Sequence, residues 1–216
     1  MARVKICGLT DPGDARHAAD LGAWAIGMIF WPGSPRRCPV EAAEGIAAEL
    51  RRRLELVGVF VNATLDEVAL TADRVGLTML QLHGDEGPAY CREAARRTGC
   101  KVMKAARVHG AADVRALRPF HTDYHLLDAY SPRSPGGTGE SFDWELVRAH
   151  PSEPPVVLSG GLTAENVGAA IRVARPFAVD TASGTEVSPG RKDPAKLTAF
   201  FRAVEAAGAP AESPAA

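Results

Sequence analysis

The amino-acid sequence predicts a single-domain (β/α)8 barrel, an α/β fold, and three of its features carry that prediction. Eight short runs of β-branched and apolar residues follow one another, helical segments separate them, and no linker interrupts the series. Such alternation is typical of βα units and a parallel sheet. Eight units in 216 residues fit a small barrel. The alternative is a doubly wound open sheet, but that fold usually has fewer strands, and no GxGxxG motif follows the first run.

The predicted strands are the eight short β-branched or apolar runs. In order they cover residues 3–8, 23–30, 54–62, 78–84, 101–108, 124–129, 155–161 and 177–184. The helical segments place apolar residues three and four apart, which is the period of a helix with one buried face. The clearest cover residues 39–53, 64–76, 87–99, 163–176 and 193–207. We expect one barrel domain over residues 1–207 and a loose tail, rich in Ala, Pro and Ser, over residues 208–216.

Composition and charge limit the classes of function. Apolar residues make up 46% of the chain and charged residues 24%, which is ordinary for a soluble globular protein. The formal net charge of −1 gives no long-range attraction to nucleic acid or to an anionic membrane. No run approaches the roughly 20 apolar residues of a membrane span, and residues 1–11 lack the apolar core of a signal peptide. We therefore expect neither a nucleic-acid partner nor a membrane.

The four cysteines, Cys7, Cys38, Cys91 and Cys100, indicate a reducing compartment. None belongs to a CxxC pair, and no histidine lies at the spacing of a zinc site. A chain of this size without an export signal is expected to keep its thiols reduced in the cytoplasm. The sequence predicts no metal site.

Strand parity predicts which side chains face the interior of the barrel, because alternate residues of a strand point to opposite sides. In the first strand, Val4 and Ile6 should pack outward, and Lys5 and Cys7 should face inward. Polar inward residues near the top of a barrel are costly unless they are paired or used, and barrel enzymes carry their chemistry at the C-terminal strand ends. By the same rule the inward residues of later strands are Gln81, His83, Leu126, Asp128, Ala178 and Asp180, and the outward residues are Leu80, Leu82, Leu127, Phe177 and Val179.

Cys7 and Asp128 have side chains that suit proton transfer. A lone cysteine is commonly a small buried hydrophobe, but Cys7 shares a face with Lys5. A nearby ammonium lowers a thiol pKa, and the thiolate can act as a base or nucleophile. Asp128 could instead be a helix cap or part of a surface ion pair. The long loop after it, residues 129–144, is typical of a lid, and a carboxyl group desolvated under a lid suits a general acid.

Small residues at the ends of the seventh and eighth runs predict a phosphate site. Gly160 and Gly161 end one run, and Ser183 and Gly184 end the other. Backbone N–H groups at such turns can approach an oxyanion, and the loops after strands seven and eight form the usual phosphate site of barrels. The alternative is two tight turns that merely need glycine. We expect a phosphorylated small-molecule substrate.

Three further residues complete the predicted substrate contacts. Arg36, in the loop after the second strand, can pair bidentately with a carboxylate or phosphate, as can its neighbour Arg37. Exposed arginines are usually only solvated, so these two residues alone do not establish a contact with the substrate. His83 is most simply a hydrogen-bonded structural histidine at the barrel mouth. We assign Arg36, His83 and Asp180 to substrate binding.

Six segments together resemble one family. They are VKICGLT (4–10), GVFVN (58–62), LQLHGDE (80–86), LLDA with GGTGESFDW (126–129 and 136–144), LSGGLTAENV (158–167) and RPFAVDTASGTEVSPGRKD (175–193). From Arg3 to Phe201 the chain resembles the phosphoribosylanthranilate isomerases of tryptophan biosynthesis. The resemblance implies a (β/α)8 barrel and an Amadori rearrangement of phosphoribosylanthranilate to 1-(o-carboxyphenylamino)-1-deoxyribulose 5-phosphate, without cofactor or metal, by a monomer or homodimer.

The resemblance also implies residue roles. The cysteine of KICG, here Cys7, is similar to the general base of the family, and Asp128 to the general acid. Arg36, rather than Arg37, is similar to the arginine that holds the anthranilate carboxylate. The small residues after strands seven and eight are similar to the phosphate-binding site of the family. Two stretches depart from the pattern: DTASGTE (180–186) stands where DVSSGVE is usual, and Glu140 stands where Lys or Gln is commoner.

Other functions fit the sequence less well. The related histidine-pathway isomerase performs the same rearrangement on a bulkier substrate, but such enzymes generally have an aspartate where this chain has Cys7. They also show a half-barrel repeat, and no second SGGL occurs in the first half here. A barrel that only binds a phosphorylated metabolite would not need both Cys7 and Asp128. A scaffold protein would need an exposed apolar helix pattern, which the sequence does not show.

Overall fold

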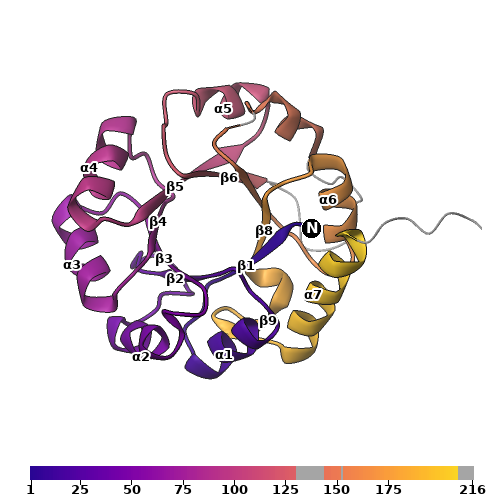
Figure 1. The fold of residues 1–216 in the computed structure, drawn as a ribbon, viewed down its shortest axis with the longest axis horizontal. Coiled ribbons are helices and arrows are strands. Elements are labelled where there is room, and N and C mark those ends of the chain that lie inside the picture. Colours follow the sequence, from indigo (N-terminus) through magenta and orange to yellow (C-terminus); the bar gives the residue numbers. More distant parts are fainter. Residues whose placement is uncertain (130–143, 152, 209–216) are drawn as a thin grey trace, which may run out of the picture.

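Eight parallel strands form a closed barrel, as the sequence predicts, in a computed structural model that describes residues 1–129, 144–151 and 153–208. Each strand pairs with the next in chain order, and β8 pairs with β1 to close the ring. Figure 1 shows the ring end-on with the helices outside it. The strands are β1 (Arg3–Cys7), β2 (Ala25–Ile29), β3 (Glu55–Phe60), β4 (Met79–Leu82), β5 (Lys101–Val108), β6 (Tyr124–Ala129), β7 (Val156–Ser159) and β8 (Ala178–Thr181). All eight lie within the predicted runs.

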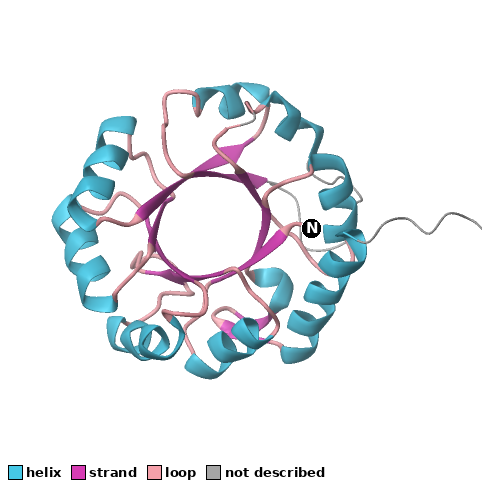
Figure 2. Cartoon of the chain, viewed as in Figure 1, coloured by secondary structure: helices cyan, strands magenta, loops and turns pink. Residues whose placement is uncertain are grey.

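The five predicted helices are confirmed, and the outer layer contains further short helical elements (Figure 2). The segment before β6 and the one before β7 form α5 (Ala111–Ala116) and a 3-10 helix, η1 (Trp144–Ala149). These elements and α1 bury few apolar side chains, so they lack the periodicity that identified the others. The remaining helices are α1 (Pro12–Asp20), α2 (Val40–Leu50), α3 (Leu65–Val75), α4 (Pro88–Thr98), α6 (Val167–Ala174) and α7 (Pro194–Gly208).

Local signals explain where the best-defined helices begin and end. In α3 the hydroxyl of Thr64 accepts from the backbone N–H of Glu67, and the Glu67 carboxylate accepts from the backbone N–H of Thr64, which is a capping box. The helix is followed by Gly76 in the left-handed region, at φ 73°. In α1, Asp11 caps the first turn by accepting from the N–H groups of Gly13 and Asp14.

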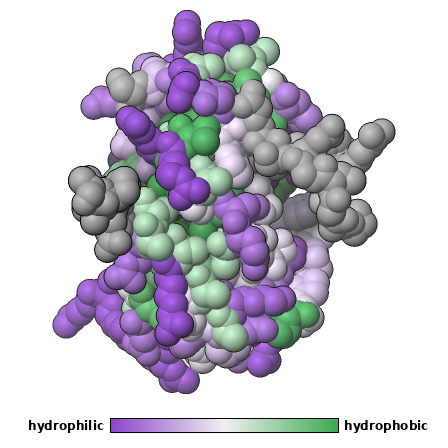
Figure 3. All heavy atoms as spheres, turned by 90° about the vertical axis from the view of Figure 1, so that its right-hand side faces the viewer, coloured by the Kyte–Doolittle hydropathy of each residue, from purple (hydrophilic) through white to green (hydrophobic). Residues whose placement is uncertain are grey.

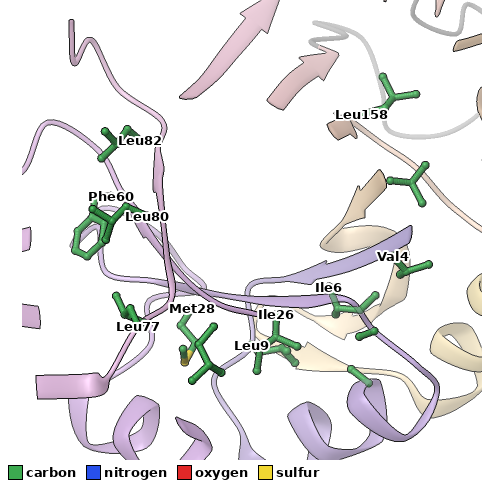
Figure 4. Packing of buried hydrophobic residues seen from close by; sticks show 14 of the residues in the cluster. Val4, Ile6, Leu9, Ile26, Met28, Phe60, Leu77, Leu80, Leu82 and Leu158 are labelled. Carbon is green, nitrogen blue, oxygen red and sulfur yellow. The ribbon is translucent and has the colours of Figure 1, made fainter. Parts of the chain in front are cut away.

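The core has an outer and an inner part, in agreement with strand parity. Outward strand residues pack under the helices; Figure 4 shows Val4, Ile6 and Ile26 in this layer. The inner part fills the lower barrel with apolar side chains, namely Ala25, Val57, Met79, Met103, Ala105, Leu126, Val157 and Ala178. Towards the C-terminal strand ends the buried inward side chains include Lys5, Gln81 and Asp180, so this part of the interior is largely polar, although Val59 also lies there.

Phe177 corrects one prediction. Parity placed it outward with Val179, but it packs against the inner cluster beside Trp24 and Tyr124. The ring centroids of Trp24 lie 5.3 Å from Tyr124 and 5.2 Å from Phe177, in edge-on geometry. Phe177 precedes the first residue of β8, so the alternation of the strand does not apply to it. The three aromatic rings close the N-terminal end of the barrel.

The surface and the C-terminal end add little to the functional question. No helix among the described residues is long and apolar enough to cross a membrane. On the face shown in Figure 3, hydrophilic side chains surround small hydrophobic areas. The last helix, α7, ends at Gly208, and residues 209–216 of the predicted tail lie outside the described residues.

Candidate active site

The structure gathers the predicted polar residues at one end of the barrel. Cys7 ends β1, Ser159 ends β7, and Asp128 and Asp180 lie near the ends of β6 and β8. Because all eight strands are parallel, these positions meet at the C-terminal rim. In register, Cys7 lies beside Gly27, and Asp128 beside Ser159. The predicted location of the site is therefore where the fold concentrates polar side chains.

Lys5 and Asp180 form a buried ion pair just below this rim. The side chain of Lys5 is fully buried, and its Nζ donates to Oδ1 of Asp180 at 2.8 Å. The hydroxyl of Ser159 donates to Oδ2 at 3.1 Å. Burial acts to lower the pKa of Lys5, but Asp180 and Cys7 together outweigh it, and the pKa lies above its ordinary value. Both oxygens of Asp180 thus have internal partners, and its contact with substrate stays a prediction.

Cys7 lies next to the Lys5 ammonium, as parity predicts. The ammonium of Lys5 acts on the sulfur by its charge, which favours the thiolate. The expected lowering of the thiol pKa is nevertheless overridden, because burial raises the pKa of Cys7 more than Lys5 lowers it, and Asp180 raises it further. In the absence of substrate, the structure thus favours the neutral thiol.

Gly27 makes room for this pair. A Cβ built on Gly27 would lie 2.8 Å from Sγ of Cys7 and 3.2 Å from Nζ of Lys5. Both distances are closer than ordinary van der Waals contact, so any side chain at this position displaces the thiol or the ammonium. The site therefore requires that residue 27 of β2 be glycine.

We expect Gly27→Ala to lower kcat by about 100-fold, because a shift of about 1 Å in a reacting group can cost that much. The thermal unfolding midpoint and the kcat of the variant would be measured together. Gly45→Ala in α2 is the matched control, since a Cβ there meets nothing within 4 Å, and it should keep full activity. A folded Gly27→Ala enzyme with unchanged kcat would show that the sulfur need not lie where the structure has it.

Arg36 reaches the same rim and forms a bidentate ion pair that the sequence did not predict. Its Nε donates to Oε1 of Glu186 at 2.9 Å, and its Nη2 donates to Oε2 at 2.8 Å. Its Cδ lies 2.8 Å from where a Cβ of Gly8 would be, and Gly8 adopts φ +76°. Arg37 is exposed. Arg36 is thus oriented beside β1 before any substrate is bound.

Lys192 ties this ion pair to Cys7. Its Nζ donates to Oε1 of Glu186 at 3.1 Å, to the backbone oxygen of Cys7 at 2.7 Å and to that of Ala182 at 2.9 Å. Burial acts to raise the pKa of Glu186, but Arg36 and Lys192 hold it below its ordinary value. Glu186 and Lys192 lie on a two-stranded hairpin, β9 (Glu186–Ser188) and β10 (Arg191–Lys192), which sequence reasoning missed. The Ser-Pro-Gly turn at residues 188–190 was the available signal for it.

His83 and Asp128 lie together on the opposite side of the rim. Nε2 of His83 is 3.3 Å from Oδ2 of Asp128, and the two side chains are 21% and 30% exposed. Nδ1 of His83 is 3.0 Å from Nε2 of Gln81, which is buried inside the barrel. Arg107 of β5 is the register neighbour of Asp128. The structure therefore groups His83 with the candidate acid, and its contact with substrate stays a prediction.

The loops after β7 and β8 pack against each other. Gly160 and Gly161 have positive φ, 99° and 62°, which glycine adopts without strain. Ser183 and Gly184 lie in a short 3-10 helix, η2 (Ser183–Thr185), and a Cβ on Gly184 would overlap the backbone oxygen of Leu162. The first N–H groups of any helix lack an intrahelical partner. Glycine thus serves close packing of the two loops here, which is compatible with the predicted phosphate site and does not test it.

Three further predictions concern the lid, the state of the cysteines and metal binding. The proposed lid, with Glu140, falls within residues 130–143, which lie outside the described residues. All four cysteines are free thiols, as predicted, and burial raises the pKa of Cys38 to about 11. Within residues 1–129, 144–151 and 153–208, no group of three or more His, Cys, Asp or Glu side chains could hold a metal ion.

Comparison with known proteins supplies an independent view of the chain. Residues 4–203 match the family model described as N-(5'-phosphoribosyl)anthranilate (PRA) isomerase. The N-(5'-phosphoribosyl)anthranilate isomerase of Citrifermentans bemidjiense is 50% identical over 197 residues, which cover 91% of this chain and 94% of the relative. The enzyme of the same name from Geobacter metallireducens is 44% identical over 206 residues, 95% of this chain and 100% of the relative.

Solved structures agree with the sequence relatives. The phosphoribosyl anthranilate isomerase of Thermotoga maritima superposes with a TM-score of 0.85 at 41% identity, covering 95% of this chain and 100% of that one. A phosphoribosyl anthranilate isomerase in complex with reduced 1-(o-carboxyphenylamino)-1-deoxyribulose 5-phosphate superposes with a TM-score of 0.82 at 39% identity, with the same coverage.

Proposed function

Because the chain belongs to the N-(5'-phosphoribosyl)anthranilate isomerase family, and is thus an isomerase of tryptophan biosynthesis, we propose that it uses Cys7 as the general base and Asp128 as the general acid. The observation that carries the proposal is the position of both groups at the C-terminal rim, one on β1 and the other on β6. These strands lie apart around the barrel, so the two groups can address a bound sugar from different sides.

The proposed reaction is an Amadori rearrangement of phosphoribosylanthranilate. Asp128 donates its proton to the ring oxygen of the ribose, the C1′–O bond breaks, and a Schiff base forms. The thiolate of Cys7 then removes the proton from C2′ to give an enolamine, which tautomerises to the ketone. Asp128 has lost a proton and Cys7 has gained one, so both must exchange protons before the next turnover.

The substrate would bind through its two anionic ends. The loops with Gly160, Gly161, Ser183 and Gly184 are proposed to hold the phosphate, and Arg36 the anthranilate carboxylate. A relative bound to a product analogue supports a phosphorylated ligand of this kind. Glu186 already occupies Nε and Nη2 of Arg36, so the remaining guanidinium nitrogen is the one proposed to meet the carboxylate. His83 and Asp180 are proposed to support the substrate from the rim.

Lys5 is proposed to hold the Cys7 thiolate once it forms. We expect the thiol pKa to rise in Lys5→Met/Asp180→Asn, because the lowering by Lys5 exceeds the raising by Asp180. Lys5→Met alone would leave a buried carboxylate unpaired at a cost of about 3–5 kcal/mol. The measurement is the pH dependence of Cys7 alkylation, followed by peptide mass spectrometry. Asp180→Asn alone should shift the thiol pKa downward; an unchanged or lower value in the double variant would contradict the role of Lys5.

The activity itself is tested by the fluorescence of freshly prepared phosphoribosylanthranilate, which should decay when purified protein is added. Decay supports the isomerase, whereas binding without decay would leave a barrel that only holds a phosphorylated metabolite. The histidine-pathway substrate serves as the comparison, and we expect no turnover of it because the end of β1 carries Cys7. We further propose a cytoplasmic enzyme that needs no metal or cofactor and works as a monomer or homodimer; one relative is described as dimeric.

A further inference from the structure

A chain of three side chains crosses the inner face of β4 and reaches the proposed acid. Gln81 Nε2 lies 3.0 Å from His83 Nδ1, and His83 Nε2 lies 3.3 Å from Asp128 Oδ2. We propose that Gln81 is a positioning residue that sets the direction of the hydrogen bonds in this chain, and that His83 returns to Asp128 the proton which it gives up in each turnover. This inference rests on the proposed role of Asp128.

The direction of the chain follows from the chemistry of imidazole. A neutral ring has one N–H, so one nitrogen donates and the other accepts. With the Gln81 amide nitrogen on Nδ1, that nitrogen accepts, and Nε2–H must donate to an ionised Asp128. With the Gln81 carbonyl on Nδ1–H instead, Nε2 can accept the carboxyl proton of a neutral Asp128. Rotating one amide group therefore exchanges the two proton states of the acid.

Gln81 is hydrogen-bonded at one end of its amide group and unsatisfied at the other. The side chain is 1% exposed, and its Oε1 is a buried side-chain oxygen or nitrogen without a hydrogen-bond partner, the one such atom within the described ranges. His83 is thus the partner of the amide, and either orientation leaves the other end of the amide unsatisfied. A buried group left this way in a native structure calls for an explanation. Rotation of the Gln81 amide group during the proton cycle explains why its other end is left without a partner.

The proposed cycle balances its protons. Asp128 gives its carboxyl proton to the ring oxygen and is left ionised. His83, which is partly exposed, takes up a proton from solvent at one nitrogen and becomes an imidazolium whose Nδ1–H donates to the Gln81 carbonyl. It passes the Nε2 proton to Asp128 and returns to the neutral form. The proton that Cys7 removed from C2′ leaves to solvent, so no net proton is consumed.

Charged groups of β5 and of the loop after β4 lie around this pair. Lys104 of β5 donates to the backbone oxygens of Leu82 and Gly84, on either side of His83, and its charge is paired with Glu86. This pair holds the His83 backbone in place without adding net charge. Arg107 on β5, Asp85 in the loop after β4 and Asp113 on α5 line the same cavity as His83. The ionisable groups on the other side of the rim are Lys5 and Cys7 on β1, Asp180 on β8, and the group of Arg36, Glu186 and Lys192.

Two substitutions of opposite character test the proposal. Gln81→Glu offers only acceptors to Nδ1–H and stabilises the imidazolium, so the alkaline limb of the kcat–pH profile should move to higher pH. Gln81→Met has no polar group at that position, so the limb should move to lower pH and kcat should fall about 10-fold with little change in KM. Met79→Leu, two residues earlier on the same inward face, is the control, and it should change neither the position of the alkaline limb nor kcat. Shifts in the same direction, or none, would overturn the proposal.

Ring-nitrogen NMR tests the chain without relying on the variants or on turnover. In ¹⁵N-histidine-labelled wild type, the His83 signals are identified by their loss in His83→Gln. Above the pH of ring titration we expect an unprotonated Nδ1 and a protonated Nε2. A protonated Nδ1 there would contradict the chain even if Gln81 variants fail to fold. If wild type does not isomerise the substrate, the proposed function fails, and the ring nitrogens still report separately on the hydrogen bonds.

Discussion

Cys7→Ser should lower kcat about 1,000-fold with a much smaller change in KM, because general base catalysis is worth about 100- to 10,000-fold. A serine hydroxyl has nearly the size of the thiol but does not ionise at accessible pH, so the bound substrate keeps its position while the base is lost. The assay is the fluorescence decay of phosphoribosylanthranilate at saturating concentration. Retention of activity within about 3-fold of wild type would remove Cys7 from the mechanism.

The pH dependence of kcat/KM gives a second test of Cys7 as the general base. Burial raises the pKa of Cys7 above its ordinary value, so at neutral pH only a small fraction of the free enzyme carries the thiolate. We therefore expect kcat/KM of wild type to rise about 10-fold per pH unit on the acid limb, where the proposed acid is still protonated, since each unit multiplies the thiolate fraction by that factor. Cys7→Ser should lose this slope. Cys100→Ala, a buried cysteine just before β5 and thus at the opposite, N-terminal end of the barrel, is the matched control and should keep it.

The barrel itself could be predicted because its information is local. Each strand is a short apolar run and most helices show a clear period, so eight units could be counted without knowledge of any contact. Parity then placed Lys5, Cys7 and Asp128 on the inner face correctly. It failed at Phe177, because that residue precedes the first residue of β8. The short α1 and α5 were missed since each buries only one or two apolar side chains.

The ion pairs of the site could not be predicted because they depend on closure of the barrel. Lys5 meets Asp180 only because β1 and β8 pair at a register that places these two residues side by side. Arg36 meets Glu186 across 150 positions of sequence. No local spacing encodes such a contact. The sequence shows which charged residues face the rim, and only the three-dimensional register shows which of them neutralise one another and which stay available to a substrate.

The opposing effects on Cys7 show how this matters for function. Sequence reasoning identified the ammonium next to the thiol and expected a lowered pKa. The structure adds the burial of the sulfur and the carboxylate of Asp180, and together they reverse the sign. The neutral thiol that results is protected from oxidation and alkylation, which act on the thiolate, and in the proposed mechanism Cys7 ionises only when substrate is bound. Lys5 is already paired with the Asp180 carboxylate, and its ammonium is proposed to stabilise the charge of the Cys7 thiolate as well.

Asp128→Asn should also lower kcat about 1,000-fold, because an amide of the same shape cannot give a proton to the ring oxygen. The sign of the pH effect separates this role from that of Cys7. An acid must be protonated to act, so wild-type kcat should fall above the pH at which the His83–Asp128 pair loses its shared proton, and this alkaline limb should vanish in the variant.

Two comparisons make the Asp128 prediction decisive. Asp128→Glu keeps the acid but lengthens its side chain, so it should retain the alkaline limb at reduced kcat. Asp123→Asn, at the N-terminal end of the same strand, keeps an oxygen for the N–H of Val102 and should behave as wild type. If Asp128→Asn loses activity but its alkaline limb persists, the proton comes from another group. His83 would then be the acid itself, since its Nε2 lies 3.3 Å from the carboxylate and the Gln81 contact already orients its ring.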